Sequence, residues 1–202
     1  MAQGYVRDLV PRWALEELGL SYQVRQVNRE ERTSEQYLKL QPFGQVPVYE
    51  EDGLVLFESG AIALHIAEKS EMLMPKDKKS QAQVKAWMFA VANSLDPHVR
   101  NFQQIEFFSA DEEWAPLRRP AMIAGLKICL QPLEKYLDGR EYLVNEFSAA
   151  DILMTVILRN IGPDALITSS PNLNHYIHRC ESRPAFQTAL TKQIASFSGP
   201  DP

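Results

Sequence analysis

The sequence predicts an α+β protein with a small sheet in its first third and helices in the remainder. Two short hydrophobic runs, at residues 46–49 and 54–57, flank a polar turn that contains Asp52-Gly53. Short apolar runs joined by an Asp-Gly turn are typical of a β-hairpin. From residue 81 onward no segment has a convincing strand pattern, and hydrophobic residues recur at helical spacing. A mixed part followed by an all-helical part is therefore expected.

Composition narrows the classes of function. The 202 residues are 45% hydrophobic and 23% charged, and the net charge of −5 argues against general binding of nucleic acid. No hydrophobic run approaches the roughly 20 residues that cross a bilayer, and no signal peptide follows Met1. The two cysteines and four histidines show no metal-ligand spacing. We therefore expect a cytoplasmic protein without a metal or a membrane partner.

The segments before the hairpin predict one helix and one strand. Residues 11–20 have a helical pattern that ends at Gly19, a residue suited to the end of a helix, with Asp8 as a possible N-cap. Residues 22–27 alternate as a strand does, and residues 34–40 indicate a short helix that Pro42 stops.

Two features of the hairpin region suggest a binding site. Pro47 opens a strand, and the Val46–Pro47 bond is a candidate for the cis form, which would free the Val46 backbone to pair with an extended peptide. Glu58 and Ser59 stand at the start of the next helix, where free N–H groups attract a carboxylate and Glu58 attracts an ammonium. The two sites together suit an amino-acid head group. The alternative is a hairpin followed by an ordinary capped helix.

The run PFGQVPVYEEDGLVLFESGAIALHIAEK, residues 42–69, resembles the glutathione-binding half of a cytosolic glutathione transferase. The run RWALEELGL, residues 12–20, is similar to the first helix of that family. This resemblance implies a thioredoxin-like N-terminal domain at residues 1–72 and an all-helical C-terminal domain at residues 80–202. The polar stretch at residues 70–80 is predicted to be the linker between the two domains.

The resemblance also implies a role for individual residues. It implies a cis bond at Pro47, pairing of Val46 with the cysteinyl backbone of glutathione, and binding of the γ-glutamyl head by Glu58 and Ser59. Gln45 and Arg32 occupy positions that would face the glycyl end.

The first strand of the family is expected to be missing or truncated in this sequence. The family places that strand in the middle of the sheet, yet only ten residues precede Pro11 and none alternates. Either the sequence starts downstream of the natural start, or residues 1–6 form a stunted strand. The sulfur-activating residue of the family lies in this region, which makes Tyr5 the catalytic candidate, with Arg7 adding positive potential. The alternative is that Tyr5 is an N-terminal aromatic residue without a role.

Helices account for the C-terminal half. Hydrophobic stripes predict long helices at 81–108, with a kink or break at Pro97, and at 118–137, followed by closing helices at 171–180 and 184–197. Ser148 and Asp151 have the spacing of a capping box before a buried helix, a structural feature. Residues of the first long helix are candidates for a hydrophobic substrate pocket: Arg100, Phe102 and Phe107.

The expected function is transfer of the glutathione thiolate to a small hydrophobic electrophile, with glutathione as co-substrate and a homodimer as the assembly. One alternative is a non-catalytic relative that uses the fold to bind a partner. Another is a glutathione-dependent isomerase or dehalogenase; isomerase relatives usually carry a Ser-Ser-Cys run where this chain has Gly4-Tyr5-Val6-Arg7.

Overall fold

The structure is a computed structural model that describes residues 6–162 and 165–197. Contacts divide the chain into two compact units, one formed by residues up to 74 together with those from 183, the other by residues 75–182. The domain boundary expected from sequence assigned the whole C-terminal half to the second domain. In the structure, the last helix belongs instead to the first unit.

The first unit begins with helix α1 (Leu9–Glu17). The helix starts two residues ahead of Pro11, which therefore lies in the first turn, where a missing N–H costs nothing. Asp8 precedes the helix but makes no side-chain cap; its carboxylate pairs with Arg12 at 2.8 Å. Asp8 is thus the N-cap residue by position, as expected, but its carboxylate is held by an arginine one turn along and does not cap the helix. Gly19, with φ of +64°, follows the helix end as predicted.

The sheet consists of β1 (Val48–Glu51) and β2 (Leu54–Phe57), which pair antiparallel with Val48 opposite Phe57. This is the predicted hairpin. Residues 22–27 are not a strand, contrary to expectation, because the sheet of the described residues has two strands and neither pairs with this segment. Alternation alone does not make a strand; a hydrogen-bonded neighbour is required. Two single-turn helices, α2 (Arg29–Arg32) and α3 (Glu35–Leu38), lead to the hairpin.

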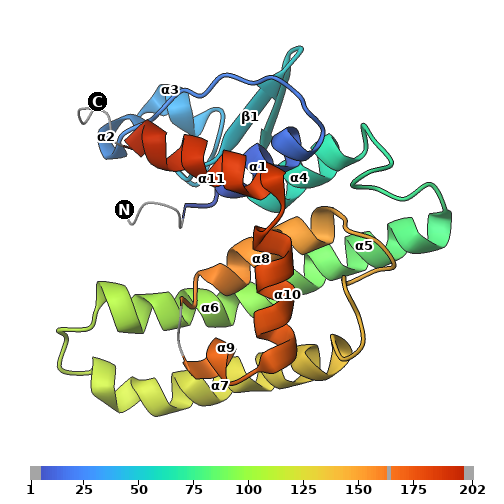
Figure 1. Cartoon of the computed structure of the whole chain (residues 1–202). Coiled ribbons are helices and arrows are strands. Elements are labelled where there is room, and N and C mark those ends of the chain that lie inside the picture. The colour runs from blue at the N-terminus through green and yellow to red at the C-terminus, as the bar shows by residue number, and fades with distance from the viewer. Residues whose placement is uncertain (1–5, 163–164, 198–202) are drawn as a thin grey trace. The chain divides into compact units, whose positions relative to one another are not determined.

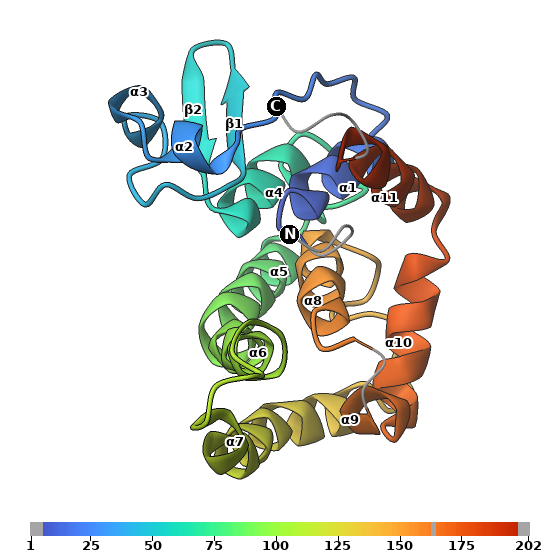
Figure 2. The ribbon, with the colours of Figure 1, turned by 90° about the vertical axis from the view of Figure 1, so that its left-hand side faces the viewer.

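Helix α4 (Ser59–Ala67) follows the hairpin and packs against α1. Helix α11 (Pro184–Phe197), distant in sequence, also packs against α1, and Figures 1 and 2 show the two helices side by side. The rings of Trp13 and Phe186 meet edge-to-face at a centroid distance of 4.8 Å. Both side chains are buried, so this contact joins the two ends of the chain in one core.

The second unit contains helices joined by loops, and the part of it that the structure describes has no strand. Its first helical stretch comprises α5 (Lys78–Ala90), η1 (Val91–Leu95), α6 (Asp96–Gln103) and η2 (Gln104–Phe108). The two η segments are π-helical, and η1 ends at Leu95, two residues before Pro97, where the sequence predicted a kink or break. Pro97 lies in the first turn of α6, where a missing N–H is tolerated.

The remaining helices of this unit are α7 (Ala115–Tyr136), α8 (Ala149–Arg159), α9 (Ala165–Thr168) and α10 (Pro171–Glu181). Helix α8 forms the centre of the core, since its residues from 149 to 158 are all buried. Ser148 and Asp151 form a capping box at its start, and the Ser148 N–H donates to the Asp151 carboxylate at 2.9 Å. The box fixes where the buried helix begins.

No helix among the described residues is long and hydrophobic enough to cross a membrane. Within residues 6–162 and 165–197, no three histidine, cysteine or acidic side chains gather in a way that would hold a metal ion.

Candidate functional site

Val46, two residues before β1, has backbone groups that are available for hydrogen bonding. The Val46–Pro47 peptide bond is cis, as the resemblance implies. Among the described residues, no hydrogen bond reaches the N–H or the C=O of Val46. Tyr37 fixes the preceding turn, because its buried hydroxyl donates to the Gln45 carbonyl at 2.7 Å. An extended ligand backbone therefore finds both groups of Val46 available.

Glu58 has an unusual backbone conformation. It is the N-cap of α4 with φ of +68° and ψ of +116°, although positive φ is uncommon for any residue other than glycine. Such strain is retained where the surrounding structure enforces it, and it concentrates at functional sites. Its side chain makes no cap hydrogen bond. The conformation turns the chain sharply between β2 and α4.

The start of α4 offers opposite charges side by side. Ser59 is buried as the first residue of the helix, and the N–H groups of residues 59–61 have no backbone acceptor among the described residues. The positive end of the helix dipole lies at the same point. The Glu58 carboxylate is exposed and makes no contact with a described residue. One carboxylate and one ammonium of a ligand can therefore be bound together here.

Arg32 and Gln45 lie on the segments that lead into β1. Arg32 ends α2 and is partly buried, and its Nε has no hydrogen-bond partner in the part of the chain that the structure describes. Gly44 adopts φ of +62°, and its Cα lies so close to the Arg32 carbonyl that an added Cβ would come within 3.0 Å. This close approach holds the two segments together. The Gln45 side chain is exposed.

The proposed sulfur-activating region is only partly visible. Tyr5 lies outside the described residues. Arg7 is described, is half-buried, and precedes α1, with its carbonyl accepting from the Val10 N–H at 3.1 Å.

The three candidate pocket residues differ in exposure. Phe102 is 2% exposed and is therefore part of the core of the second unit, where it contacts Phe107 edge-to-face. Phe107, in η2, is 62% exposed. Arg100 is exposed and donates to the buried Asp96 carboxylate at 2.9 Å. Of the three residues, Phe107 and Arg100 are therefore exposed, and Phe102 is buried against Phe107.

Sequence reasoning missed the side chains that brace the site. Besides Tyr37, Glu51 on β1 accepts hydrogen bonds from His65 Nε2, at 3.0 Å, and from Lys69, both beyond the start of α4. These bonds, that of Lys69 first, lower the pKa of Glu51 from 4.5 to about 2. They join the strand that follows Val46 to the helix that begins at Ser59. Glu51 is 14 positions from His65 and 18 positions from Lys69, and pairs so far apart leave no recognisable pattern in the sequence.

Comparison with known proteins assigns the family. Residues 3–68 match the family model for the N-terminal domain of glutathione S-transferase. Glutathione S-transferase F11 of Arabidopsis thaliana is 31% identical over an alignment of 187 positions, which covers 83% of this chain and 82% of that protein. A probable elongation factor 1-gamma of the same plant is 25% identical over 78% of this chain, but the match covers only 39% of the elongation factor.

A solved structure agrees with the fold. A glutathione transferase from Burkholderia graminis, with two glutathione molecules bound per subunit, superposes with a TM-score of 0.82 at 27% identity. The superposition covers 94% of this chain and 85% of that structure. The first unit is thus a thioredoxin-like domain with a small two-stranded sheet, followed by a helical part. The chain belongs to the cytosolic glutathione S-transferase family.

Proposed function

We propose that this chain binds glutathione at the junction of β1 and α4 and transfers its thiolate to a small hydrophobic electrophile. The observation that carries the proposal is the pairing at the start of α4 of an exposed, unpartnered Glu58 carboxylate with the free N–H groups of the helix. An α-amino acid group carries the two complementary charges on one carbon. The γ-glutamyl end of glutathione is such a group.

The rest of the tripeptide follows the backbone toward Val46. The cysteinyl amide and carbonyl pair with the free C=O and N–H of Val46, as an added strand would. The glycyl carboxylate then faces Gln45 and Arg32, whose guanidinium is suited to binding a carboxylate. Support for this alignment comes from the N–H and C=O of Val46, which make no hydrogen bond to a described residue.

The chemical step needs a thiolate. Tyr5 is the proposed donor to the sulfur, because a phenol hydrogen bond favours the charged thiolate over the thiol, and Arg7 adds positive potential. The thiol proton leaves to solvent, the sulfur attacks the electrophilic carbon, and the leaving group departs with the electron pair of the broken bond. Phe107 and Arg100 are the proposed contacts for the electrophile.

The alternative function is non-catalytic binding, which the similarity to an elongation factor 1-gamma favours. A catalytic and a non-catalytic protein would have the same fold, and only the catalytic one would convert glutathione and an electrophile to a product. The homodimer implied by the family remains a proposal, and light scattering on the purified chain would test it.

Calorimetry with glutathione tests the binding site. Ser59→Ala and Glu58→Gln should each weaken binding about tenfold, since each removes a hydrogen bond to a charged group. Ser94→Ala and Glu113→Gln change exposed residues of the same types in the second unit and should leave binding unchanged. Equal binding by all four variants would refute the site.

Conjugation of glutathione to a chlorinated dinitrobenzene tests the enzyme. Tyr5→Phe should slow conjugation at least tenfold without weakening the binding of glutathione. Tight binding of glutathione with no conjugation of this or other electrophiles by the unaltered chain would establish the non-catalytic alternative.

A further inference from the structure

Large hydrophobic side chains are exposed in the second unit where α6 and η2 end and α7 begins (Figure 1). We call this part of the unit the tip and define it as residues 104–119, which comprise η2, the turn at residues 109–114 and the start of α7. Phe108 is 72% exposed, Trp114 is 37% exposed and Leu117 is 81% exposed. A group of large exposed hydrophobic side chains is a feature of surfaces that bind a partner.

Contacts within the tip hold its backbone in place. The Glu106 carboxylate of η2 pairs with Arg119 of α7 at 2.6 Å, which joins the two helical segments. Two backbone hydrogen bonds close the turn at residues 109–115, and the Arg118 guanidinium lies 5.9 Å from the centre of the Trp114 ring. The exposed side chains are thus carried by an ordered backbone, which lowers the entropy that is lost when a partner binds.

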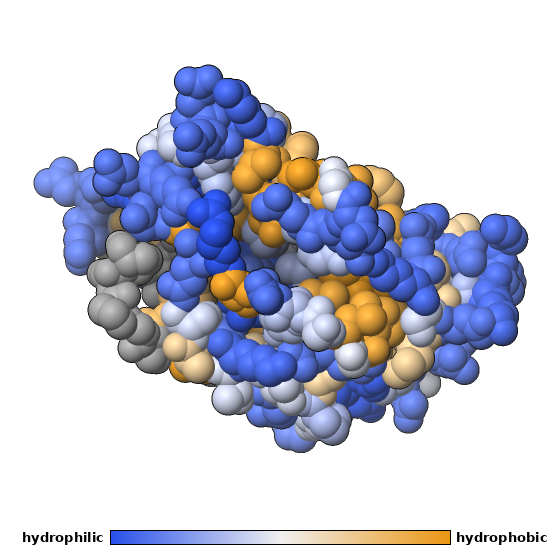
Figure 3. Space-filling view, turned by 90° about the horizontal axis from the view of Figure 1, so that it is seen from above, coloured by the Kyte–Doolittle hydropathy of each residue, from blue (hydrophilic) through white to orange (hydrophobic). Residues whose placement is uncertain are grey.

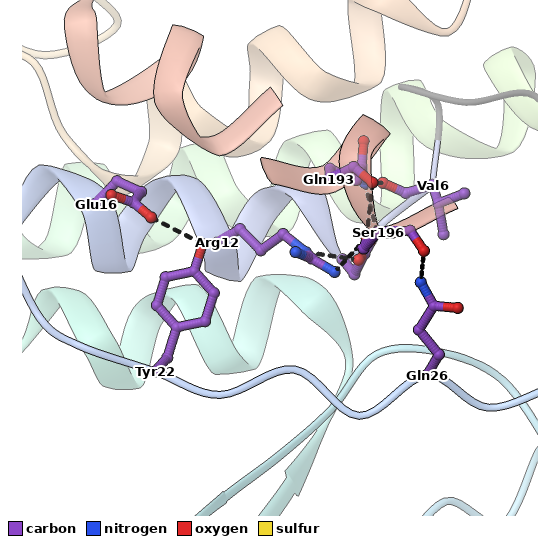
Figure 4. A network of polar contacts seen from close by, with 8 residues as sticks. Val6, Arg12, Glu16, Tyr22, Gln26, Gln193 and Ser196 are labelled. Carbon is purple, nitrogen blue, oxygen red and sulfur yellow. Dashed lines mark hydrogen bonds and ion pairs between the residues drawn. The ribbon is translucent and has the colours of Figure 1, made fainter. Parts of the chain in front are cut away.

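Three consecutive carboxylates lie in the turn of the tip. All three are exposed, and none forms an ion pair or hydrogen bond with another described residue: Asp111, Glu112 and Glu113. Carboxylates of the first unit show the contrast. Asp8 pairs with Arg12 at 2.8 Å, and Glu16 accepts from the Tyr22 hydroxyl at 2.8 Å (Figure 4). Adjacent like charges without counter-ions give the turn a negative potential that attracts cations.

Hydrophobic residues on a surface are not by themselves a binding site. Figure 3 shows such residues at the surface of one face of the molecule, next to hydrophilic ones, as is usual for proteins. The tip differs because its hydrophobic residues flank the three carboxylates, with Phe108 before them and Trp114 and Leu117 after them. A complementary partner therefore brings a hydrophobic surface and positive charge together.

The charge and the secondary structure of the tip disfavour other occupants. A second copy of the chain docked tip to tip would bring like charges together, and an anionic membrane would be repelled in the same way. An extended peptide has no strand edge to join, because the described part of the second unit contains no strand. A helix satisfies its own backbone hydrogen bonds and needs only side-chain contacts.

We propose that the tip is a docking site for a basic amphipathic helix of a partner protein. Hydrophobic residues on one face of that helix pack on Phe108, Trp114 and Leu117, and lysines or arginines beside that face pair with the carboxylates of residues 111–113. Trp114 is the main anchor, since buried tryptophan often dominates the free energy of binding at interfaces. Phe107 is left out because it is a proposed contact for the electrophile.

The test uses an acetylated and amidated peptide of about fourteen residues, or about four turns of helix. Leucines occupy one face, lysines occupy the other positions, and a fluorescent label reports binding to the full chain by anisotropy. One control peptide has glutamate in place of lysine. A second control has the same composition, with the leucines scattered around the helix. Each control should bind about tenfold more weakly or worse, because the first has the wrong charge and the second has no hydrophobic face.

Two triple variants separate binding at the tip from general attraction to an acidic protein. The tip variant carries Asp111→Asn, Glu112→Gln and Glu113→Gln. The control variant changes one aspartate and two glutamates at other exposed positions of the second unit: Asp138→Asn, Glu141→Gln and Glu146→Gln. Both variants change the net charge equally, yet only the tip variant should weaken peptide binding, by about tenfold at low ionic strength and by less in about 1 M salt.

The indole N–H signals of the three tryptophans locate the bound peptide. In a proton–nitrogen correlation spectrum, the peptide should shift the signal that Trp114→Phe removes and leave that of the buried Trp13 unchanged. Trp114→Ala should weaken binding about tenfold. Phe89→Ala, which removes a ring that is 66% exposed elsewhere in the second unit, should not weaken it. Glu58→Gln should leave peptide binding unchanged, so that a failure of either proposed site is recognised separately.

Four results would overturn the proposal. Equal binding by the two triple variants would mean that the carboxylates serve only α7, through its dipole. Equal binding of the scattered peptide would mean that no hydrophobic face is recognised. A shift of another indole signal in place of that of Trp114 would move the site elsewhere. Binding of the chain to anionic lipid vesicles but not to the peptide would identify a membrane surface instead. The peptide, vesicle and spectral measurements use the unaltered chain, so they decide the matter even if a variant fails to fold.

Discussion

The Tyr176 hydroxyl donates a hydrogen bond of 2.8 Å to the Asp151 carboxylate, which joins α10 to α8 inside the second unit. The same carboxylate accepts from the Leu143 N–H at 2.9 Å and from the Ser148 hydroxyl at 3.0 Å. Burial and the adjacent Asp151 raise the pKa of Tyr176 well above its ordinary value, so the phenol remains a donor. One acidic group thus organises a loop, a helix start and a second helix.

Removal of that carboxylate should destabilise the protein strongly. Asp151→Ala leaves several buried donors without an acceptor, and we expect a loss of about 3–5 kcal/mol in the free energy of unfolding, since each such donor costs about 1–3 kcal/mol. Tyr176→Phe removes only one donor and should cost about 1.5–3 kcal/mol. Urea unfolding measures both. Asp138→Ala, at an exposed position, is the control and should stay within about 0.5 kcal/mol. A similar small effect for Asp151→Ala would contradict the network.

Glu58→Gly should separate stability from binding. Glycine adopts φ of +68° without the steric cost that glutamate bears, so the variant should be at least as stable as the parent chain. It should nevertheless bind glutathione about tenfold more weakly, because the carboxylate is lost. Thermal unfolding and calorimetry on one preparation give both quantities. If Glu58→Gly lowers stability and leaves the affinity for glutathione unchanged, then Glu58 neither has a strained backbone nor binds glutathione.

The contact of Glu51 with Lys69 and His65 should contribute stability that depends on pH. The pKa of Glu51 is about 2 in the folded protein and 4.5 ordinarily, so between these values the folded state binds fewer protons than the unfolded state. Stability from this group is therefore present above about pH 4.5 and is lost as the pH falls toward 2. The melting temperature of Glu51→Gln should lie below that of the parent at pH 6 and converge with it near pH 2. Glu50→Gln, an exposed neighbour, should show no such convergence.

The attachment of α11 to α1 can be measured by a double-mutant cycle. Trp13→Ala and Phe186→Ala each remove a buried aromatic ring and should cost about 3–5 kcal/mol. The edge-to-face contact predicts a coupling of about 0.5–1.5 kcal/mol between the two changes. Phe89→Ala, which removes a ring that is 66% exposed, serves as the control. Strict additivity would show that the rings do not touch in solution.

Features that depend on neighbouring residues could be predicted from the sequence. The Asp52-Gly53 turn, the hairpin it closes, the cis bond at Pro47 and the Ser148–Asp151 spacing all lie within short stretches of chain. The hydrophobic stripes likewise gave the long helices of the second unit, and the last helix spans Pro184–Phe197 as expected. Local sequence is sufficient here because the interactions that form these elements are themselves local.

Other features were decided by contacts between distant residues. Residues 22–27 alternate as a strand does, yet they form none, because a strand is completed by the hydrogen bonds of its neighbour. Phe102 had the same helical pattern as exposed candidates, and only packing shows that it is 2% exposed. Tyr37, His65 and Lys69 brace the candidate site through partners that no spacing rule identifies.

By itself, the sequence determined the family, the hairpin and the residues at the start of α4, since motifs and turns consist of residues that are adjacent in the sequence. Tertiary structure alone decided that α11 packs on α1 and that Phe108, Trp114 and Leu117 remain exposed where η2 ends and α7 begins. Which surfaces meet, and which remain open, depends on the free energy of burying side chains that are far apart along the chain.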